Sequence, residues 1–166
     1  MIRPATSILS LIAFWCAGFF SPGIAAAQTA KDLVGAWTLL SDVNTGSDGS
    51  KVDAYGPNPL GLAIFDNSGR FAIIFSRNNL PKFASNNRMQ GTPEENRAIV
   101  QGSFAIFGTY SVADNVITQH IDGGTWPNWT GTDQQRTILA FTGDELVWAT
   151  APSIGGTTEI RWKRVK

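Results

Sequence analysis

Eight apolar runs rich in aromatic and β-branched residues follow one another along the chain, separated by turn-prone stretches of Gly, Pro, Asn and Asp. Such runs are typical of β-strands joined by short turns. The predicted strands cover residues 33–43, 60–65, 70–76, 104–112, 116–122, 134–141, 146–150 and 157–165. Antiparallel sheets of this size tend to close, because closure removes their exposed edges. We therefore expect an all-β fold: an eight-stranded antiparallel barrel, just wide enough to hold one small ligand.

The second and third runs are separated by residues 66–69, a Gly-containing loop typical of a β-hairpin. Both faces of this hairpin are apolar, with Phe71, Ile73 and Phe75 on one side of the second strand and Ala72 and Ile74 on the other. Either the hairpin is covered on both sides, or one of its faces lines an apolar cavity.

One short helix is predicted, beginning after Thr92. Thr92 can cap the helix, Pro93 suits its first position, and Glu95 completes a capping box. The helix should run to about Gln101 and end near Gly102. Because it is short and alone, we interpret it as a lid or plug on a β-body.

Residues 1–27 are predicted to be a secretory signal peptide, and residues 28–166 a single barrel domain. Arg3 precedes an apolar run over residues 8–20, and Ala25 and Ala27 form a small-residue cleavage site. The run has about 13 residues, whereas a membrane-spanning helix needs about 20, so we expect no stable membrane insertion. The only cysteine, Cys16, lies in this segment. The signal is typical of bacterial export, which predicts a periplasmic or extracellular protein that uses neither disulfides nor thiol chemistry.

Charge and motifs exclude several partners. The 13 basic and 13 acidic residues balance, and no basic run is present, so nucleic acid is not an expected partner. Phosphate-binding Gly-rich loops and two-cysteine metal motifs are also absent, and a single histidine excludes a metal site of two or three histidines. We predict no cofactor and no metal.

Several short motifs occur in a fixed order along the chain. They are Leu33-Val34-Gly35-x-Trp37, Gly61-x-x-x-Phe65-x-x-x-Gly69-x-Phe71, Phe83-Ala84-Ser85, Gly91-Thr92-Pro93-Glu94-Glu95, Phe107-Gly108-Thr109-Tyr110 and Pro127-Asn128-Trp129-x-Gly131-Thr132-x-Gln134-x-Arg136. Together they resemble the lipocalin-like domain family over nearly all of residues 28–166. The resemblance implies a small barrel with an internal pocket for apolar ligands, and it implies no assigned reaction.

The resemblance also implies a structural role for Gly35 and Trp37. Lipocalins place a Trp at this point to close the barrel floor, with a basic side chain from the last strand laid over its ring. Here that side chain would be Arg161 or Arg164, in a cation–π contact.

Pocket-lining residues are predicted mainly in the segment between the fifth and sixth strands. Two tryptophans around a Pro-Asn pair give apolar surface with a fixed amide, a combination typical of small-molecule pockets, and Gln134 and Arg136 share a strand face. Arg136 can receive a carboxylate or enolate; alternatively, it pairs with Asp133 or Glu145 on the surface. The candidate ligand-binding residues are Tyr110, His120, Trp126, Asn128, Trp129, Gln134 and Arg136.

Three functions remain open. The first is a non-enzymatic exported barrel that binds a small apolar or amphipathic molecule. The alternative is an enzyme for proton-transfer isomerisation or cyclisation, with His120 as base, Asp122 as its partner on the same strand face, and Arg136 stabilising negative charge. The third is a filled barrel that serves as an interaction or envelope-associated module and has no ligand, which a cavity below about 300 Å³ would favour.

Overall fold

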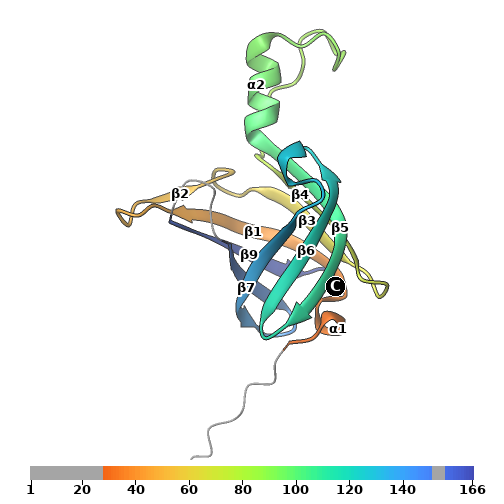
Figure 1. Cartoon of the computed structure of the whole chain (residues 1–166). Helices are drawn as coiled ribbons and strands as arrows, with labels where there is room; N and C mark the ends of the chain where they lie inside the picture. The colour runs from red at the N-terminus through yellow and green to blue at the C-terminus, as the bar shows by residue number, and fades with distance from the viewer. Residues whose placement is uncertain (1–27, 151–155) are drawn as a thin grey trace, which may run out of the picture.

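The computed structural model describes residues 28–150 and 156–166, so the predicted signal segment lies outside the described residues. One antiparallel sheet dominates the fold (Figure 1). Its strands are β1 (Gly35–Thr45), β2 (Lys51–Asp53), β3 (Leu60–Phe65), β4 (Arg70–Ser76), β5 (Ser103–Ala113), β6 (Val116–Gly124), β7 (Asp133–Phe141), β8 (Glu145–Thr150) and β9 (Thr157–Arg164). The helical elements are α1 (Ala30–Leu33), α2 (Pro93–Gly102) and the 3-10 helix η1 (Pro127–Trp129).

The sheet closes on itself, because β1 pairs with β3 on one side and with β9 on the other. From β3 to β9, each strand pairs with the next one along the chain. This confirms the predicted eight-stranded antiparallel barrel. The ninth strand, β2, lies outside the closed ring and pairs with the end of β1, in a stretch predicted to be a loop.

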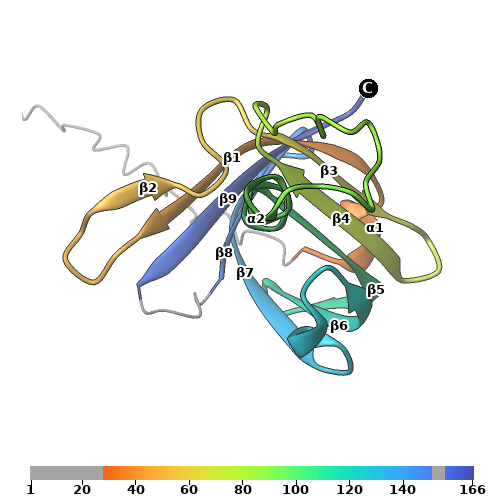
Figure 2. The same ribbon diagram turned by 90° about the horizontal axis from the view of Figure 1, so that it is seen from above.

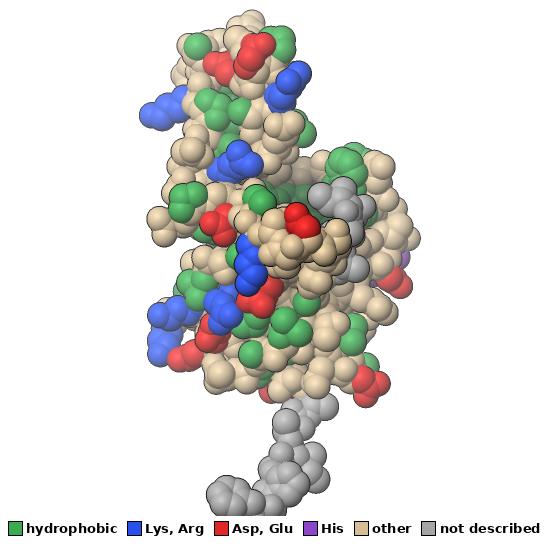
Figure 3. Space-filling model, turned by 90° about the vertical axis from the view of Figure 1, so that its left-hand side faces the viewer, with side chains coloured by type: hydrophobic (Ala, Val, Ile, Leu, Met, Phe, Trp, Pro, Cys, Tyr) green, Lys and Arg blue, Asp and Glu red, His purple; other side chains and the backbone are tan. Residues whose placement is uncertain are grey.

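The predicted helix is present as α2 and begins as its capping box requires. The Thr92 hydroxyl accepts a hydrogen bond from the Glu95 amide, and the Glu95 carboxylate accepts one from the Thr92 amide. The helix projects from the end of the barrel as a lobe of its own (Figures 1 and 3). No residue of α2 lines the interior cavity described below, so the helix does not plug it. Among the described residues, no helix combines the length and apolar character needed to cross a membrane.

One end of the barrel is closed by aromatic side chains. Trp37 is fully buried, and its indole nitrogen donates to the Leu33 carbonyl at 2.8 Å. Of the two arginines expected over Trp37, Arg164 occupies this position, with its guanidinium carbon 4.1 Å from the ring centroid. Arg161 instead lies on the outer wall. Gly35 has a φ of +133°, a backbone conformation that favours glycine, and a Cβ there would lie 2.9 Å from Arg164 Nη1.

The two faces of the β3–β4 hairpin have different surroundings. Phe71, Ile73 and Phe75 point into the barrel and are buried. On the outer face, Leu62 is 38% exposed and Ile74 is 52% exposed. Of the two alternatives for this hairpin, the structure therefore shows the one in which a single apolar face lines the interior.

Candidate ligand-binding site

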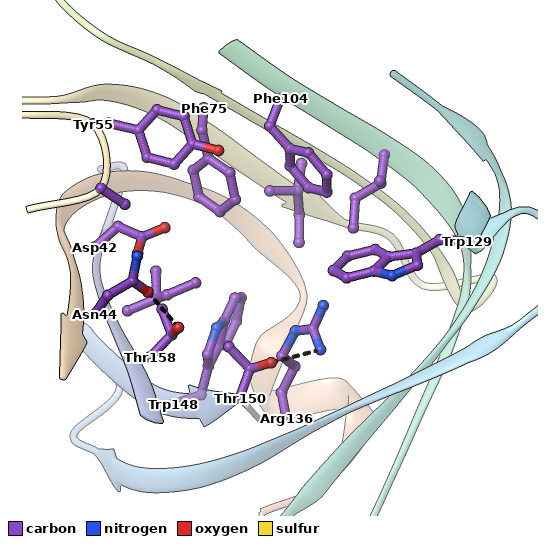
Figure 4. Close-up of a pocket in the computed structure, with 14 residues that line it drawn as sticks. Asp42, Asn44, Tyr55, Phe75, Phe104, Trp129, Arg136, Trp148, Thr150 and Thr158 are labelled. Atoms are coloured by element: carbon purple, nitrogen blue, oxygen red, sulfur yellow. Dashed lines mark hydrogen bonds between the residues drawn. The ribbon is translucent and has the colours of Figure 1, made fainter. Parts of the chain in front are cut away.

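A cavity of about 230 Å³ occupies the end of the barrel opposite Trp37 (Figure 4). Figure 2 shows the ribbon of the barrel from above, with α2 seen end-on. The cavity volume is below the roughly 300 Å³ of most ligand pockets, so by this criterion it favours the alternative without a ligand. It nevertheless exceeds the roughly 150 Å³ cavity in which an engineered protein binds benzene, and it therefore has room for a small molecule. The barrel is thus not filled by its own side chains. The cavity is lined by Asp42, Asn44, Ala54, Tyr55, Ile73, Phe75, Phe104, Ile106, Trp129, Arg136, Trp148, Thr150, Thr158 and Ile160.

Most of the wall is apolar and aromatic. Phe75 and Phe104 stack with their ring centroids 5.8 Å apart, on the adjacent strands β4 and β5. Trp148 on β8 faces them across the space (Figure 4). These rings can bury the apolar body of a small molecule, since aromatic walls of this kind dominate the binding energy of such pockets.

Arg136 on β7 brings a positive charge into this apolar space. Its side chain is 5% exposed, and its Nη1 donates to the Gln135 carbonyl at 3.0 Å and to the Thr150 hydroxyl at 3.2 Å. Its guanidinium carbon lies 5.6 Å from the ring centroid of Trp129. Burial lowers the pKa of Arg136 to about 10, an effect that the charge of Asp42 partly opposes, so the side chain is charged at neutral pH.

Arg136 forms no ion pair with any carboxylate of the described residues. The two surface partners that the sequence suggested are engaged elsewhere. Asp133 Oδ1 lies 2.7 Å from His120 Nδ1, and Glu145 Oε1 lies 2.6 Å from Arg161 Nη1. Arg136 is therefore a buried cation without an ion-pair partner among the described residues, and a ligand can supply the opposite charge.

Asp42 on β1 is the second charged group of the cavity, and sequence reasoning missed it. It is 6% exposed, and its Oδ1 has no hydrogen-bond partner in the described part of the chain. Burial raises the pKa of Asp42 to about 7, although the charge of Arg136 acts in the opposite direction. A carboxyl group in this state changes its charge near neutral pH.

A β-bulge explains why Asp42 faces inward. Trp37 and Leu39 point into the barrel, so strict alternation along β1 would next place Ser41 inside. The pairing of β1 with β9 shifts between Leu39 and Ser41, however, and the extra residue reverses the alternation, so that Asp42 points inward. The signal that could have indicated this site is that Asp42 is the only charged residue of β1.

Other polar groups surround the Asp42 end of the cavity (Figure 4). The Thr158 hydroxyl donates to Asn44 Oδ1 at 2.5 Å. Burial, together with the charge of Asp42, raises the pKa of the Tyr55 hydroxyl, which therefore stays protonated. This end offers several hydrogen-bonding groups to a ligand, whereas the aromatic wall adds the indole N–H of Trp148, which is buried and has no partner among the described residues.

The loop between β6 and β7 contributes one of its two tryptophans. Trp129 is half-buried, lines the cavity and packs edge-on against Phe104 at 5.6 Å. The other two candidates of this loop, Trp126 and Asn128, are exposed and do not line the cavity. Trp126 precedes η1 and Asn128 lies within it, and only Trp129, the last residue of η1, reaches the barrel mouth.

Two further candidates lie away from the cavity. The Tyr110 hydroxyl lies 3.1 Å from the Ala30 carbonyl and 3.0 Å from the Asp66 carbonyl, where it ties α1 to the β3–β4 turn. Gln134 donates to the Thr132 hydroxyl. Neither residue lines the cavity, so the predicted contact with a ligand is corrected for both.

The predicted catalytic pair is also corrected. His120 and Asp122 do share a strand face, but it is the outer face of the barrel. The His120 side chain is 50% exposed and contacts Asp133, while Asp122 forms an ion pair with Arg70 at 2.8 Å. His120 is therefore separated from the cavity by the barrel wall and cannot act as a base there.

A closed antiparallel barrel of eight strands with a cavity at one end is the architecture of lipocalin-type barrels. A family model described as a lipocalin-like domain matches residues 34–165, and the chain therefore belongs to this family. Within the described residues, no group of three or more His, Cys, Asp or Glu side chains is arranged to hold a metal ion.

The solved structures similar to this chain include two barrels obtained by design. One is a redesigned beta barrel, with 12% sequence identity and a TM-score of 0.44; the match covers 84% of this chain and 97% of that one. The other is a de novo fluorescence-activating beta barrel, with 13% identity and a TM-score of 0.40; it covers 82% and 96% of the two chains. A search of curated proteins finds no match.

Proposed function

We propose that this protein binds one small amphipathic molecule in the cavity at the barrel mouth. The anionic group of the ligand contacts Arg136, and its apolar body packs against Phe75, Phe104 and Trp148. The observation that carries this proposal is a charged arginine, 5% exposed, that borders an unfilled apolar cavity and has no carboxylate partner among the described residues.

The physical reason is the high free energy of an unpaired buried charge. Taking a cation out of water is unfavourable unless hydrogen bonds or an opposite charge compensate. Arg136 donates to the Gln135 carbonyl and the Thr150 hydroxyl, both from Nη1, so the rest of its planar group can donate to a carboxylate. A ligand anion would therefore gain a strong, charge-assisted contact in a weakly screened site.

Cavity size restricts the ligand class. A volume of about 230 Å³ suits a molecule of one ring, two small rings or a short branched chain, by comparison with the roughly 150 Å³ that holds benzene. Small aromatic and branched aliphatic acids fit this description better than long acyl chains.

The test is a titration followed by tryptophan fluorescence, because Trp129 and Trp148 line the cavity. Benzoate, 4-methylbenzoate and 3-phenylpropionate are compared with their uncharged amides, and isothermal titration calorimetry repeats each measurement. We expect the acids to bind more tightly than the amides and Arg136→Gln to weaken the binding of the acids by a factor of at least ~10, since hydrogen bonds to a charged group contribute about 1.5–3 kcal/mol.

The matched control is Arg161→Gln, which removes an arginine from the outer wall. This variant and His120→Ala are expected to keep the wild-type Kd. Equal affinity for acids and amides, or unchanged binding in Arg136→Gln, would contradict the proposal.

We further propose that the protein is exported, on the basis of the signal-like composition of residues 1–27. Expression of the full chain in a bacterial host should yield a mature protein that begins at Gln28, as measured by intact mass. An uncleaved 166-residue chain retained inside the cell would argue against export.

A further inference from the structure

The cavity carries two opposite charges on separate walls. Asp42 projects from β1 and Arg136 from β7, and the strands β9 and β8 lie between them in the sheet. Figure 4 shows the two side chains on different sides of the space, with Trp148 and Thr150 between them. They form no ion pair with each other, and neither pairs with any other charged side chain of the described residues.

Asp42 itself lacks the partner that a buried carboxyl requires. Its Oδ1 is buried and accepts no hydrogen bond from the described residues. The nearby Thr158 hydroxyl already donates to Asn44. Because an unsatisfied buried acceptor is unfavourable, a donor supplied by a ligand would be strongly stabilised at this position.

We propose that the ligand is a small zwitterion, with a carboxylate at Arg136, a protonated amine at Asp42 and a short apolar body between them. This inference rests on the proposed function, since it uses the same cavity and the same contact at Arg136. It adds the second recognition contact and therefore the chemical class: a compact amino acid whose amine and carboxylate are at opposite ends.

Charge neutrality supports a zwitterion over a simple acid. A simple carboxylate would neutralise Arg136 and place a second acidic group in the space that Asp42 borders, which favours protonation of Asp42. An ammonium group has the opposite effect, because it stabilises the ionised carboxylate. The two ligand classes therefore predict opposite responses to pH.

The groups that face Asp42 determine this response. Across the cavity these are Arg136 and the neutral Tyr55 hydroxyl. On the strands that pair with this part of β1, Lys51, Asp53 and Glu159 lie with Val43 and Thr45 in a groove on the other side of β1. Arg161, on β9, forms ion pairs with Glu145 and Glu159 on the outer wall. Asp42 is thus the cavity group that titrates near neutral pH, while Arg136, with a pKa of about 10, keeps its charge.

The experiment compares 4-(aminomethyl)benzoate with 4-methylbenzoate, which differ in the amine alone, by isothermal titration calorimetry at pH 6 and pH 8. The amine should improve the affinity at pH 8 by a factor of at least ~10. Because Asp42 has a pKa of about 7, binding of the zwitterion should be about tenfold weaker at pH 6 and should release a proton. The methyl compound should show the opposite response: it should bind more tightly at pH 6 than at pH 8 and take up a proton.

Asp42→Asn should abolish the preference for the amine and its pH dependence, whereas the matched variant Asp53→Asn on the exposed strand β2 should preserve both. Flexible probes, 6-aminohexanoate and hexanoate, repeat the comparison without a ring. If 4-methylbenzoate binds as tightly as the zwitterion and depends on Arg136, the zwitterion inference fails while the proposed function stands. If no compound of either pair binds, both fail.

Discussion

Replacing Asp42 by asparagine should stabilise the folded protein, and by an amount that depends on pH. The substitution preserves the shape of the side chain and removes its charge. In the free protein this charge is buried, and its Oδ1 is unpaired in the described structure, so its removal relieves a desolvation penalty.

The pKa shift gives the magnitude and the sign. The pKa of Asp42 is raised from 3.8 to about 7 on folding, so between these values the folded state binds the proton more tightly than the unfolded state. The free energy of unfolding of the wild type therefore falls as the pH rises through this window, by about 1.4 kcal/mol per pH unit. Asparagine does not titrate. The difference in free energy of unfolding between Asp42→Asn and the wild type should therefore increase by about 2.5 kcal/mol, in favour of the variant, from pH 5 to pH 8.

Urea unfolding of both proteins at pH 5, 6, 7 and 8 measures this difference, with far-UV circular dichroism as the signal. Titration of all other groups largely cancels in the comparison. Asp53→Asn, at an exposed position of β2, serves as the control and should change stability by less than about 0.5 kcal/mol. A stability difference for Asp42→Asn that does not change with pH, or that falls as the pH rises, would refute the burial argument.

Two further substitutions test the barrel itself, both by thermal and urea unfolding. Gly108→Ala should destabilise the fold by at least ~2 kcal/mol, because the added Cβ would lie 1.9 Å from the His120 carbonyl oxygen. The control Gly131→Ala has open space around the added Cβ but a φ of +76°, and it should cost only about 1 kcal/mol. Equal losses of stability in the two variants would contradict this account. Arg164→Met should destabilise the fold by about 2 kcal/mol or more, because the guanidinium donates to three backbone carbonyls at the closed end and covers Trp37. The control Arg161→Met breaks two surface ion pairs and should cost under about 1 kcal/mol. A larger loss of stability for Arg161→Met than for Arg164→Met would contradict the structural role given to Arg164.

The barrel could be predicted from the sequence because local patterns specify it. The turn after Phe65, the capping box at Thr92 and the alternation from Phe104 to Val112 each involve neighbours in the chain, and the structure has a hairpin, a helix and a strand at these positions. The short strand β2 was missed, since its three exposed residues carry no hydrophobic pattern.

The candidate site could be predicted only in part, because strand alternation does not reveal bulges. Arg136 lies on a strand whose alternation is regular up to that point, and its predicted cavity position matches the structure. Asp42 follows a bulge that arises from the pairing of β1 with β9, a contact between distant parts of the chain. For His120 the strand period correctly put His120 and Asp122 on one face. The polar Gln119 interrupts the apolar face formed by Ile117 and Ile121, so the sequence did not assign the inner face.

The effects of replacing Asp42 on stability and on binding, taken together, distinguish a carboxyl group that contacts a ligand from one that does not. A carboxyl group that served the fold alone would be replaced with a gain in stability and no other consequence. Here the same substitution, Asp42→Asn, is expected to raise the free energy of unfolding above pH 5 and to remove the preference for an amine-bearing ligand. Residues that lower stability while providing a binding contact are characteristic of functional sites. Finding both effects in one variant would show that the barrel retains an unpaired charge for recognition; a gain in stability without any loss of binding would leave Asp42 with no role in the cavity.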